Sequence, residues 1–331
     1  MSRSSPQLVR VSSGSAVALG LVDGRLLVKP ETLYLLTHHP DGCLANCAFC
    51  PQARSHQGKS DHLSRVTWPT FSYQEVLAAI QHSPPNDAKR VCVQTLNQTQ
   101  ILGSVLSTVE DIHALSKLPI SVSTQPMTEK QIGQLADAGV DRIGIPLDGA
   151  TEEVFDRVKG RVVHGPYTWT NHIRGLETAI EVLGKGRVTT HLIVGLGESD
   201  CELLETAQRV FDMGVQPALF AFTPVPGTQL ERRAQPSLQR YRRIQLATYL
   251  VTSQEVRFEE MTFDSSGRLV GLGAPREDLD RVLSSGEPFR TSGCPNCNRP
   301  FYNERPSGPL YNYPRPLTAD EIHEVEKQIP L

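Results

Sequence analysis

The sequence predicts an α/β fold, a partial (β/α)6 barrel followed by an irregular C-terminal extension. Short runs of β-branched residues alternate with amphipathic stretches, and six such pairs follow one another along the chain. Strands that are separated by helices pair in parallel through right-handed crossovers. The cysteine-rich and glycine-rich segments follow strands, where parallel α/β folds place functional groups. A doubly wound sheet is the alternative, because periodicity alone does not separate the two architectures.

Each expected strand is a short apolar run, and residues with helical spacing follow it. The expected strands are 32–37, 90–96, 120–124, 142–147, 188–196 and 218–223. The expected helices are 73–82, 109–118, 129–138, 152–158, 167–183, 202–213 and 237–253. The pattern then changes to a hairpin over 257–273, a short helix near 278–283 and a charged helix over 319–327. We therefore divide the chain into an N-terminal extension (1–31), the barrel (32–255) and a C-terminal extension (256–331).

Composition and charge exclude several classes of protein. The chain has 331 residues, a net charge of −3, 21% charged residues and 39% hydrophobic residues, which suits a packed core. The nearly balanced charge gives no reason to expect nucleic-acid binding. No apolar run approaches the roughly 18–20 residues of a membrane span, and the apolar patch at 16–21 is too weak for a secretory signal. We expect a cytoplasmic protein with no membrane partner.

Five of the seven cysteines lie in two tight groups. In GCLANCAFCPQAR, Cys43, Cys47 and Cys50 fall within eight residues, and Cys294 and Cys297 lie in GCPNCNRPFYNERP. Three thiolates on one loop suit a [4Fe–4S] cluster with one iron left open, because such clusters are held by cysteine sulfur. The alternative is one zinc ion shared by the two Cys-x2-Cys pairs. Zinc would leave Cys43 unexplained, and the pairs are much farther apart in sequence than those of zinc ribbons.

The spacing of these three cysteines, their place after the first strand and the aromatic Phe49 before Cys50 resemble the radical SAM superfamily. The resemblance implies a TIM-like partial barrel in which S-adenosylmethionine (SAM) chelates the open iron. One electron then breaks the sulfonium bond, and the resulting 5′-deoxyadenosyl radical removes a hydrogen atom from an unactivated carbon. In such enzymes the cofactors carry the difficult chemistry, and the protein positions them.

The same resemblance implies residues that contact SAM. HLIVGLGES is similar to the superfamily's Ile-x-Gly-x-x-Glu segment through Ile193 and Glu198, and Val225 in FAFTPVPGTQL is similar to an apolar wall against adenine. Asp148 ends the fourth strand, where it either binds the ribose or belongs to the cap of the next helix, which is made by Asp148 or by Thr151. The strand-end residues expected at the methionine portion of SAM are Gln94, Ser123 and Thr124.

Within the superfamily, the barrel resembles the biotin-synthase-like branch. That branch places a cluster cysteine in the second strand, where this chain has Cys92, but Cys92 is equally a candidate for a buried free thiol. Biotin synthase itself needs further cysteines in its third and fifth strands, and ISVSTQ and VTTHLIVGL contain none. Cys201, at the start of a helix, is expected to be structural.

The CANC loop followed by PQAR, the segment LSRVTWP and the tail CPNCNRPFYNERP resemble the two-component lipoyl synthases. This implies a second, auxiliary [4Fe–4S] cluster held partly by Cys294 and Cys297, which donates sulfur to a protein-bound octanoyl chain. The implied partners are a companion radical SAM subunit, an octanoylated lipoyl domain or glycine-cleavage H protein, and a ferredoxin or flavodoxin. Arg299 and Arg305 either bind acidic groups on the carrier or support the tail.

Two other functions remain open at this point. One is a radical SAM enzyme of another reaction type, such as a mutase or a hydrogenase maturase. The other is a zinc-stabilised binding protein that is not an enzyme. A zinc ribbon or a redox dithiol also remains possible for the Cys294–Cys297 pair alone.

Overall fold

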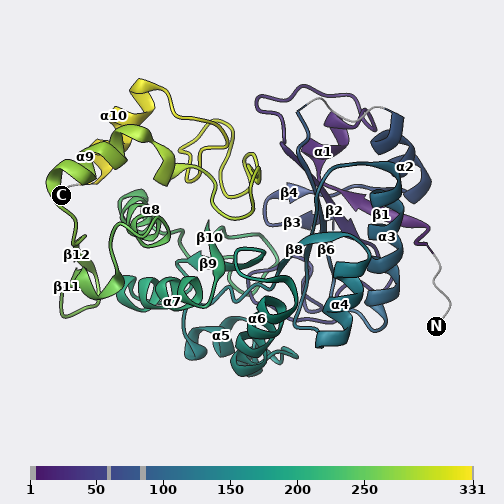
Figure 1. Cartoon of the computed structure of the whole chain (residues 1–331), viewed down its shortest axis with the longest axis horizontal. Helices are drawn as coiled ribbons and strands as arrows, with labels where there is room; N and C mark the ends of the chain where they lie inside the picture. The colour runs from purple at the N-terminus through teal and green to yellow at the C-terminus, as the bar shows by residue number, and fades with distance from the viewer. Residues whose placement is uncertain (1–4, 58–60, 83–86, 330–331) are drawn as a thin grey trace.

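The computed structural model describes residues 5–57, 61–82 and 87–329. Its main sheet has eight strands in the order β10-β9-β8-β7-β6-β2-β1-β5, and the run from β2 to β10 is parallel (Figure 1). The parallel strands are β2 (Thr32–Thr37), β6 (Arg90–Gln94), β7 (Ile120–Ser123), β8 (Val140–Gly144), β9 (Val188–Val194) and β10 (Val215–Ala221). They lie side by side in chain order, which confirms the predicted partial (β/α)6 barrel.

The parallel strands are largely buried because they are covered on both faces. All six residues of β2 are buried, as expected for a parallel strand between the barrel interior and an outer layer of helices. Tyr34 is in register with Cys92, and Cys92 is in register with Ser121 on β7. All three side chains line the barrel interior.

Helices form the outer layer, and local sequence marks where several begin. Thr128 and Ser199 make capping boxes with Gln131 and Glu202 at the starts of two of them. The helices that cover the barrel are α2 (Tyr73–His82), α3 (Ile101–Leu115), α4 (Glu129–Asp137), α5 (Glu152–Val158), α6 (Trp169–Leu183), α7 (Asp200–Asp212) and α8 (Leu238–Thr252).

Several predicted boundaries were wrong by two residues or more, among them the following two. Helix α3 starts at Ile101, eight residues before the expected start at Val109, because Val105, Val109 and Ile112 pack into the core together despite weak helix formers around them. The fourth strand ends at Gly144, and the expected residues up to Leu147 lie outside it. Pro146 has no N–H to donate to a sheet.

The N-terminal region adds strands that the sequence pattern did not predict. Strand β1 (Leu8–Val11) pairs antiparallel with β2 on one side and with β5 (Thr70–Ser72) on the other. A short helix, α1 (Ser13–Ala18), and a small hairpin of β3 (His62–Leu63) and β4 (Val66–Thr67) lie beside them. The segment before the barrel thus contributes a strand to the main sheet.

Residues 286–317, here called the tail, close the open side of the barrel. On the β2 side, the Thr32 hydroxyl donates to the Asn296 carbonyl at 2.8 Å. On the β10 side, the Leu219 N–H donates to Ser292 Oγ at 2.9 Å and Asn303 donates to the Ala221 carbonyl. Figure 1 shows the yellow-green tail reaching from α8 towards the purple N-terminal strands.

The remaining C-terminal elements agree with the sequence expectations. Strands β11 (Thr262–Phe263) and β12 (Leu269–Gly271) form the expected hairpin, and α9 (Arg276–Ser285) and α10 (Ala319–Gln328) are the two expected helices. Across the described ranges, no helix is both long and apolar enough to span a membrane.

Candidate active site

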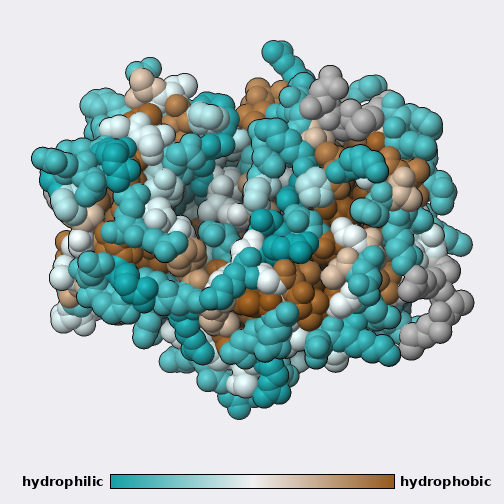
Figure 2. Space-filling view, in the orientation of Figure 1, coloured by the Kyte–Doolittle hydropathy of each residue, from teal (hydrophilic) through white to brown (hydrophobic). Residues whose placement is uncertain are grey.

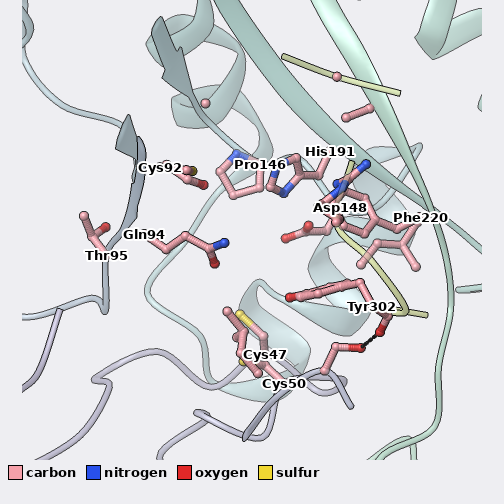
Figure 3. Close-up of a pocket in the computed structure, with 18 of the residues that line it drawn as sticks. Cys47, Cys50, Cys92, Gln94, Thr95, Pro146, Asp148, His191, Phe220 and Tyr302 are labelled. Atoms are coloured by element: carbon pink, nitrogen blue, oxygen red, sulfur yellow. Dashed lines mark hydrogen bonds between the residues drawn. The ribbon is translucent and has the colours of Figure 1, made fainter. Parts of the chain in front are cut away.

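The barrel and the tail together enclose a chamber, and this face of the molecule is hollowed near its centre (Figure 2). In Figure 3, Gln94, Asp148 and Tyr302 point into the open space, with Cys47 and Cys50 on one side and Cys92 across from them. The sequence-predicted residues that line the chamber are Cys43, Cys47, Phe49, Cys50, Cys92, Gln94, Ser123, Asp148, Ile193, Cys294 and Cys297. Residues from distant parts of the sequence thus meet in one site.

The first thiol group, Cys43, Cys47 and Cys50, lies on the loop after β2. Its alanines are buried, and the Ala48 N–H donates to the Val158 carbonyl while the Ala48 carbonyl accepts from Leu230. The buried Asn46 amide donates to the Val163 carbonyl at 2.6 Å. Small residues and one amide between the cysteines therefore fix the loop to two neighbouring parts of the barrel.

The surroundings of the first thiol group favour sulfur in its anionic form only when a positive partner is present. Burial raises the pKa of Cys47 well above its usual range and raises the pKa of Cys50 to about 12. Backbone N–H groups donate to two of the sulfurs, Asn97 to Cys43 at 3.3 Å and Gln52 to Cys50 at 3.4 Å. Buried thiols bind metals as thiolates, so a metal group and these N–H donors together would ionise them.

The second thiol group, Cys92, Cys294 and Cys297, lies deeper in the barrel. The Tyr34 hydroxyl is 3.5 Å from the sulfur of Cys297, and the Ser121 hydroxyl is 3.8 Å from the sulfur of Cys294. Tyr34 and Ser121 lie in the middle and near the start of their strands, so this group lies towards the amino ends of the strands. The tail delivers two cysteines beside the one on β6.

Arginines surround the second thiol group. Arg90 is 4% exposed and donates to the Pro295 carbonyl and to Ser121 Oγ. Burial raises the pKa values of Cys92 and Cys294, and the charge of Arg90 opposes that rise at both sulfurs. Arg299 opposes it at Cys92 as well. Buried cations of this kind suit an anionic group bound by the thiolates.

Both thiol groups fit iron–sulfur clusters better than one shared zinc ion. In a cluster each cysteine binds a different iron, so the sulfurs are spread around the group. Among the residues that the structure describes, no three His, Cys, Asp or Glu side chains gather around a single ion site. The Cys47–Cys50 pair and the Cys294–Cys297 pair belong to the two different thiol groups, which argues against the expected zinc alternative.

Asp148 faces the chamber in a buried ion pair. Lys159, which is 1% exposed, donates to Asp148 Oδ2 at 2.8 Å and to the Pro146 carbonyl at 2.5 Å. Asp148 has a φ of 66°, and its N–H and C=O bond to His191 and Ile193 on β9. Thr151, not Asp148, caps helix α5. The capping alternative for Asp148 is therefore wrong, and its carboxylate remains available at the chamber wall.

Three residues expected to contact SAM do not line the chamber, namely the buried Thr124, Glu198 and Val225. Glu198 has a fully buried carboxylate that accepts the N–H groups of Gly195 and Leu196 and pairs with Arg240. It therefore shapes the loop after β9 instead of reaching into the chamber. Val225 is buried, and its carbonyl accepts both the N–H and the hydroxyl of Thr228. Glu198 and Val225 thus support turns beside the site.

Several chamber residues were missed by sequence reasoning. His191 is half-buried and packs against Phe220, and desolvation lowers its pKa to about 4. Arg299 stacks on the same ring, with its guanidinium carbon 3.8 Å from the ring centroid. This contact favours tail support among its two expected roles, while Arg305 is exposed. The other missed residues are Tyr34, Lys159, Tyr167 and Tyr302, and of these only Tyr302 lies in a segment that the sequence had singled out.

Residues 37–210, more than half of the chain, match the family model of the radical SAM superfamily. The chain belongs to the radical SAM superfamily. A member of this superfamily uses a [4Fe–4S] cluster and SAM, and the three cysteines on the loop after β2 are the residues that fit the cluster.

Among curated proteins, the chain is similar to biotin synthases at low identity. It is 24% identical to the enzyme of Sulfurihydrogenibium over 204 residues, covering 60% of this chain and 57% of that enzyme. It is 24% identical to the Myxococcus xanthus enzyme over 278 residues, covering 80% and 76%. The first of these matches therefore spans little more than half of the relative's length.

Solved structures support the radical SAM fold. A methylornithine synthase matches with a TM-score of 0.51 and 11% identity, covering 72% of this chain and 66% of that one. HydG, a maturase of the [FeFe]-hydrogenase, also matches with a TM-score of 0.51, at 13% identity, covering 72% and 53%. At these identities the likeness concerns the fold alone.

Proposed function

We propose that this radical SAM enzyme inserts sulfur and is one subunit of a two-component lipoyl synthase. Its substrate would be an octanoyl chain carried on a lysine of a lipoyl domain or glycine-cleavage H protein. The observation that carries the proposal is the presence of two thiol groups in the walls of one chamber. An enzyme that only cleaves SAM needs the first, whereas sulfur insertion also needs a source of sulfur.

The residues divide the work between the two ends of the chamber. When bound, the first cluster and SAM would supply a carbon radical able to remove a hydrogen atom, and the second cluster would supply sulfide sulfur. Cys43, Cys47 and Cys50 would hold the first cluster. Cys294 and Cys297, with Cys92, would hold the second. The buried walls keep water from the radical.

Tyr302 supports this division because it lies between the two groups. The charges of Cys50 and of Cys92 both raise the pKa of its hydroxyl, and the side chain is half-buried. Figure 3 shows its ring beside the open space, near Asp148 and Phe220. A substrate chain in this space would have the residues for the radical-generating cluster on one side and those for the sulfur-donating cluster on the other, which is the arrangement that sulfur insertion requires.

The third strand carries Ser121 and no cysteine, whereas the biotin-synthase-like pattern would need one there. Ser121 holds the third-strand position in register with Cys92, and the tail brings Cys294 to its hydroxyl. A second cluster held from the tail would occupy the barrel interior without cysteines in β7 or β9. This supports an auxiliary cluster with a ligand set different from that of biotin synthase.

The partners follow from the proposed reaction. A companion radical SAM subunit would complete the two-component enzyme, and a ferredoxin or flavodoxin would deliver the electron that SAM cleavage consumes.

The test is mass spectrometry of an octanoylated carrier peptide after anaerobic turnover, with and without the companion subunit. We expect about eight irons per chain after reconstitution, four for each [4Fe–4S] cluster. Cys294→Ala should still release methionine and 5′-deoxyadenosine but form no thiolated peptide, whereas Cys47→Ala should release neither product.

Cys201→Ala is the matched control, because Cys201 lies on α7 outside the chamber. It should retain both activities. About four irons per wild-type chain would favour a mutase or maturase type of reaction instead. Full thiolation by Cys294→Ala would refute the role of the tail cysteines in holding the sulfur donor.

A further inference from the structure

A second cavity, here called the side cavity, adjoins the chamber. It has a volume of about 290 Å³, close to the lower end of the roughly 300–1,000 Å³ typical of ligand pockets. Four residues line both spaces, namely Tyr34, Gln94, Arg299 and Tyr302. The two spaces therefore adjoin at these four side chains.

The walls of the side cavity are mainly apolar. They come from the N-terminal loop, the β3–β4 hairpin and the tail: Leu26, Leu27, Val28, Val66, Trp68 and Phe301. Leu27 is 70% exposed, an unusual exposure for a leucine in a soluble protein's loop. Apolar side chains also show as brown atoms in the upper centre of Figure 2, where Figure 1 draws the N-terminal loop. Such walls suit an unbranched aliphatic chain.

One polar group in the wall has no protein partner. Trp68 is 1% exposed, and its indole Nε1 makes no hydrogen bond with any described residue. A buried N–H without an acceptor costs free energy, so it commonly marks a place for a ligand oxygen or a water molecule. By contrast, the hydroxyls of Ser12 and Ser13, also in the wall, are bonded to Ser15 and to Thr67.

The rim of the side cavity is basic. Arg25 is exposed and lines it, and Arg305 is exposed beside the lining residue Pro306. Arg65, next to the lining Val66, lies near enough to Arg305 for that charge to lower its pKa, although burial lowers it more. A protein that presents an acyl-lysine from an acidic surface would fit this rim.

From this arrangement we infer that the side cavity is the binding channel for a lysine-linked medium-length acyl chain. The acyl amide carbonyl accepts from Trp68 Nε1, and the far carbons pass Tyr34 and Tyr302 into the chamber. The inference rests on the proposed function for the identity of the acyl chain, but it concerns binding and includes no chemical step.

The experiment measures binding of peptides that carry Nε-octanoyl-, hexanoyl- or butanoyl-lysine to the reconstituted enzyme under anaerobic conditions without reductant. Affinity should fall about three- to fourfold for each methylene removed, because the chain is buried against apolar walls. Val66→Trp fills the side cavity and should weaken octanoyl-peptide binding at least tenfold and abolish the chain-length dependence. Val28→Trp fills the side cavity from another wall, so that the test does not depend on the folding of Val66→Trp alone.

Val270→Trp is the matched control, since Val270 is 62% exposed on the β11–β12 hairpin. It should bind like the wild type. Iron content and thermal melting verify that each variant is folded and loaded. Trp68→Phe should weaken binding of the octanoyl-lysine peptide about fivefold, which is the effect of one hydrogen bond.

The outcomes separate this inference from the proposed function. Unchanged octanoyl-peptide binding by folded Val66→Trp and Val28→Trp would overturn the channel, even if the wild type forms thiolated product. Unchanged octanoyl-peptide binding by folded Trp68→Phe would overturn the role of the amide carbonyl. Chain-length-dependent binding without thiolation would support the channel and count against sulfur insertion.

Discussion

At the scale of single residues, Lys159 and Asp148 place a buried pair of opposite charges in the chamber wall. The pair costs solvation free energy, and well-packed apolar residues would often serve stability as well or better. The Lys159 ammonium lies 5.2 Å from the Tyr167 ring, and its charge favours the thiolate form of Cys47. We interpret the pair as a device that holds Asp148 ready for a ligand while it offsets the negative charge of the first cluster.

His172 makes the stability of the protein depend on pH. It is 1% exposed beside Phe155 and Tyr167, and burial lowers its pKa to about 2. The unfolded chain has a histidine pKa near 6.5, so below that pH only the unfolded state takes up the proton. This contribution is complete above about pH 6.5 and is lost as the pH falls towards 2.

We predict that this residue alone lowers the free energy of unfolding by about 2 kcal/mol between pH 7 and pH 5. Urea denaturation at both values should therefore show a smaller loss for His172→Gln than for the wild type. The change in unfolding free energy with pH has to be compared between the two proteins, because carboxylates with lowered pKa values, such as Asp212, also reduce stability at low pH. An equal loss of unfolding free energy in the two proteins between pH 7 and pH 5 would contradict the prediction.

At the scale of elements, Arg242 attaches the tail to helix α8. It is 1% exposed, donates to the carbonyls of Leu310 and Tyr311, and lies 5.7 Å and 5.3 Å from the rings of Phe289 and Tyr313. The tail has little regular structure, so side-chain contacts of this kind carry much of its order. Cys294 and Cys297 depend on that order for their positions.

We predict that Arg242→Met loosens the tail, at about 1–3 kcal/mol for the Leu310 carbonyl that is left without a donor. The Tyr311 carbonyl still accepts from Gln245 Nε2 at 3.0 Å. Limited proteolysis should cut within residues 286–317 several times faster than in the wild type, and iron should fall towards four per chain. SAM cleavage depends on the loop after β2 and should be affected less. Arg276→Met, at a surface pair on α9, is the control and should behave as the wild type.

At the scale of the whole molecule, the chamber depends on contacts between the two ends of the chain. Thr32 and Asn296 are 264 residues apart in sequence and form a hydrogen bond. Groups that bind in the chamber therefore link β2, β6 and the tail, and binding to the folded state raises stability by mass action. Order in the tail and loading of the clusters should rise together.

We predict that anaerobic reconstitution with iron and sulfide raises the melting temperature by about 5–10 °C. The variant with both Cys294→Ala and Cys297→Ala should show only part of this rise, because only the first thiol group remains. Differential scanning fluorimetry or calorimetry would measure it. An identical rise in the double variant would mean that the tail cysteines bind no cluster.

Much of the fold and part of the site followed from the sequence. Strand periodicity predicted six parallel units, and the spacing of Cys43, Cys47 and Cys50 predicted one group of three thiols, because both are local properties of the chain. The boundaries failed where local propensity is weak, as at the start of α3. Strand β1 escaped notice because four residues are too few to show a period.

What the sequence determined by itself was the alternation of strands and helices and the chemistry of the cysteines, since neither needs contacts between distant residues. Only the tertiary structure decided that Cys92 lies with Cys294 and Cys297, that Lys159 and His191 face the same chamber, and that Glu198 supports a loop. Those outcomes depend on strand register and on the path of an irregular tail. Both are set by packing between residues far apart in the chain, which no local pattern records.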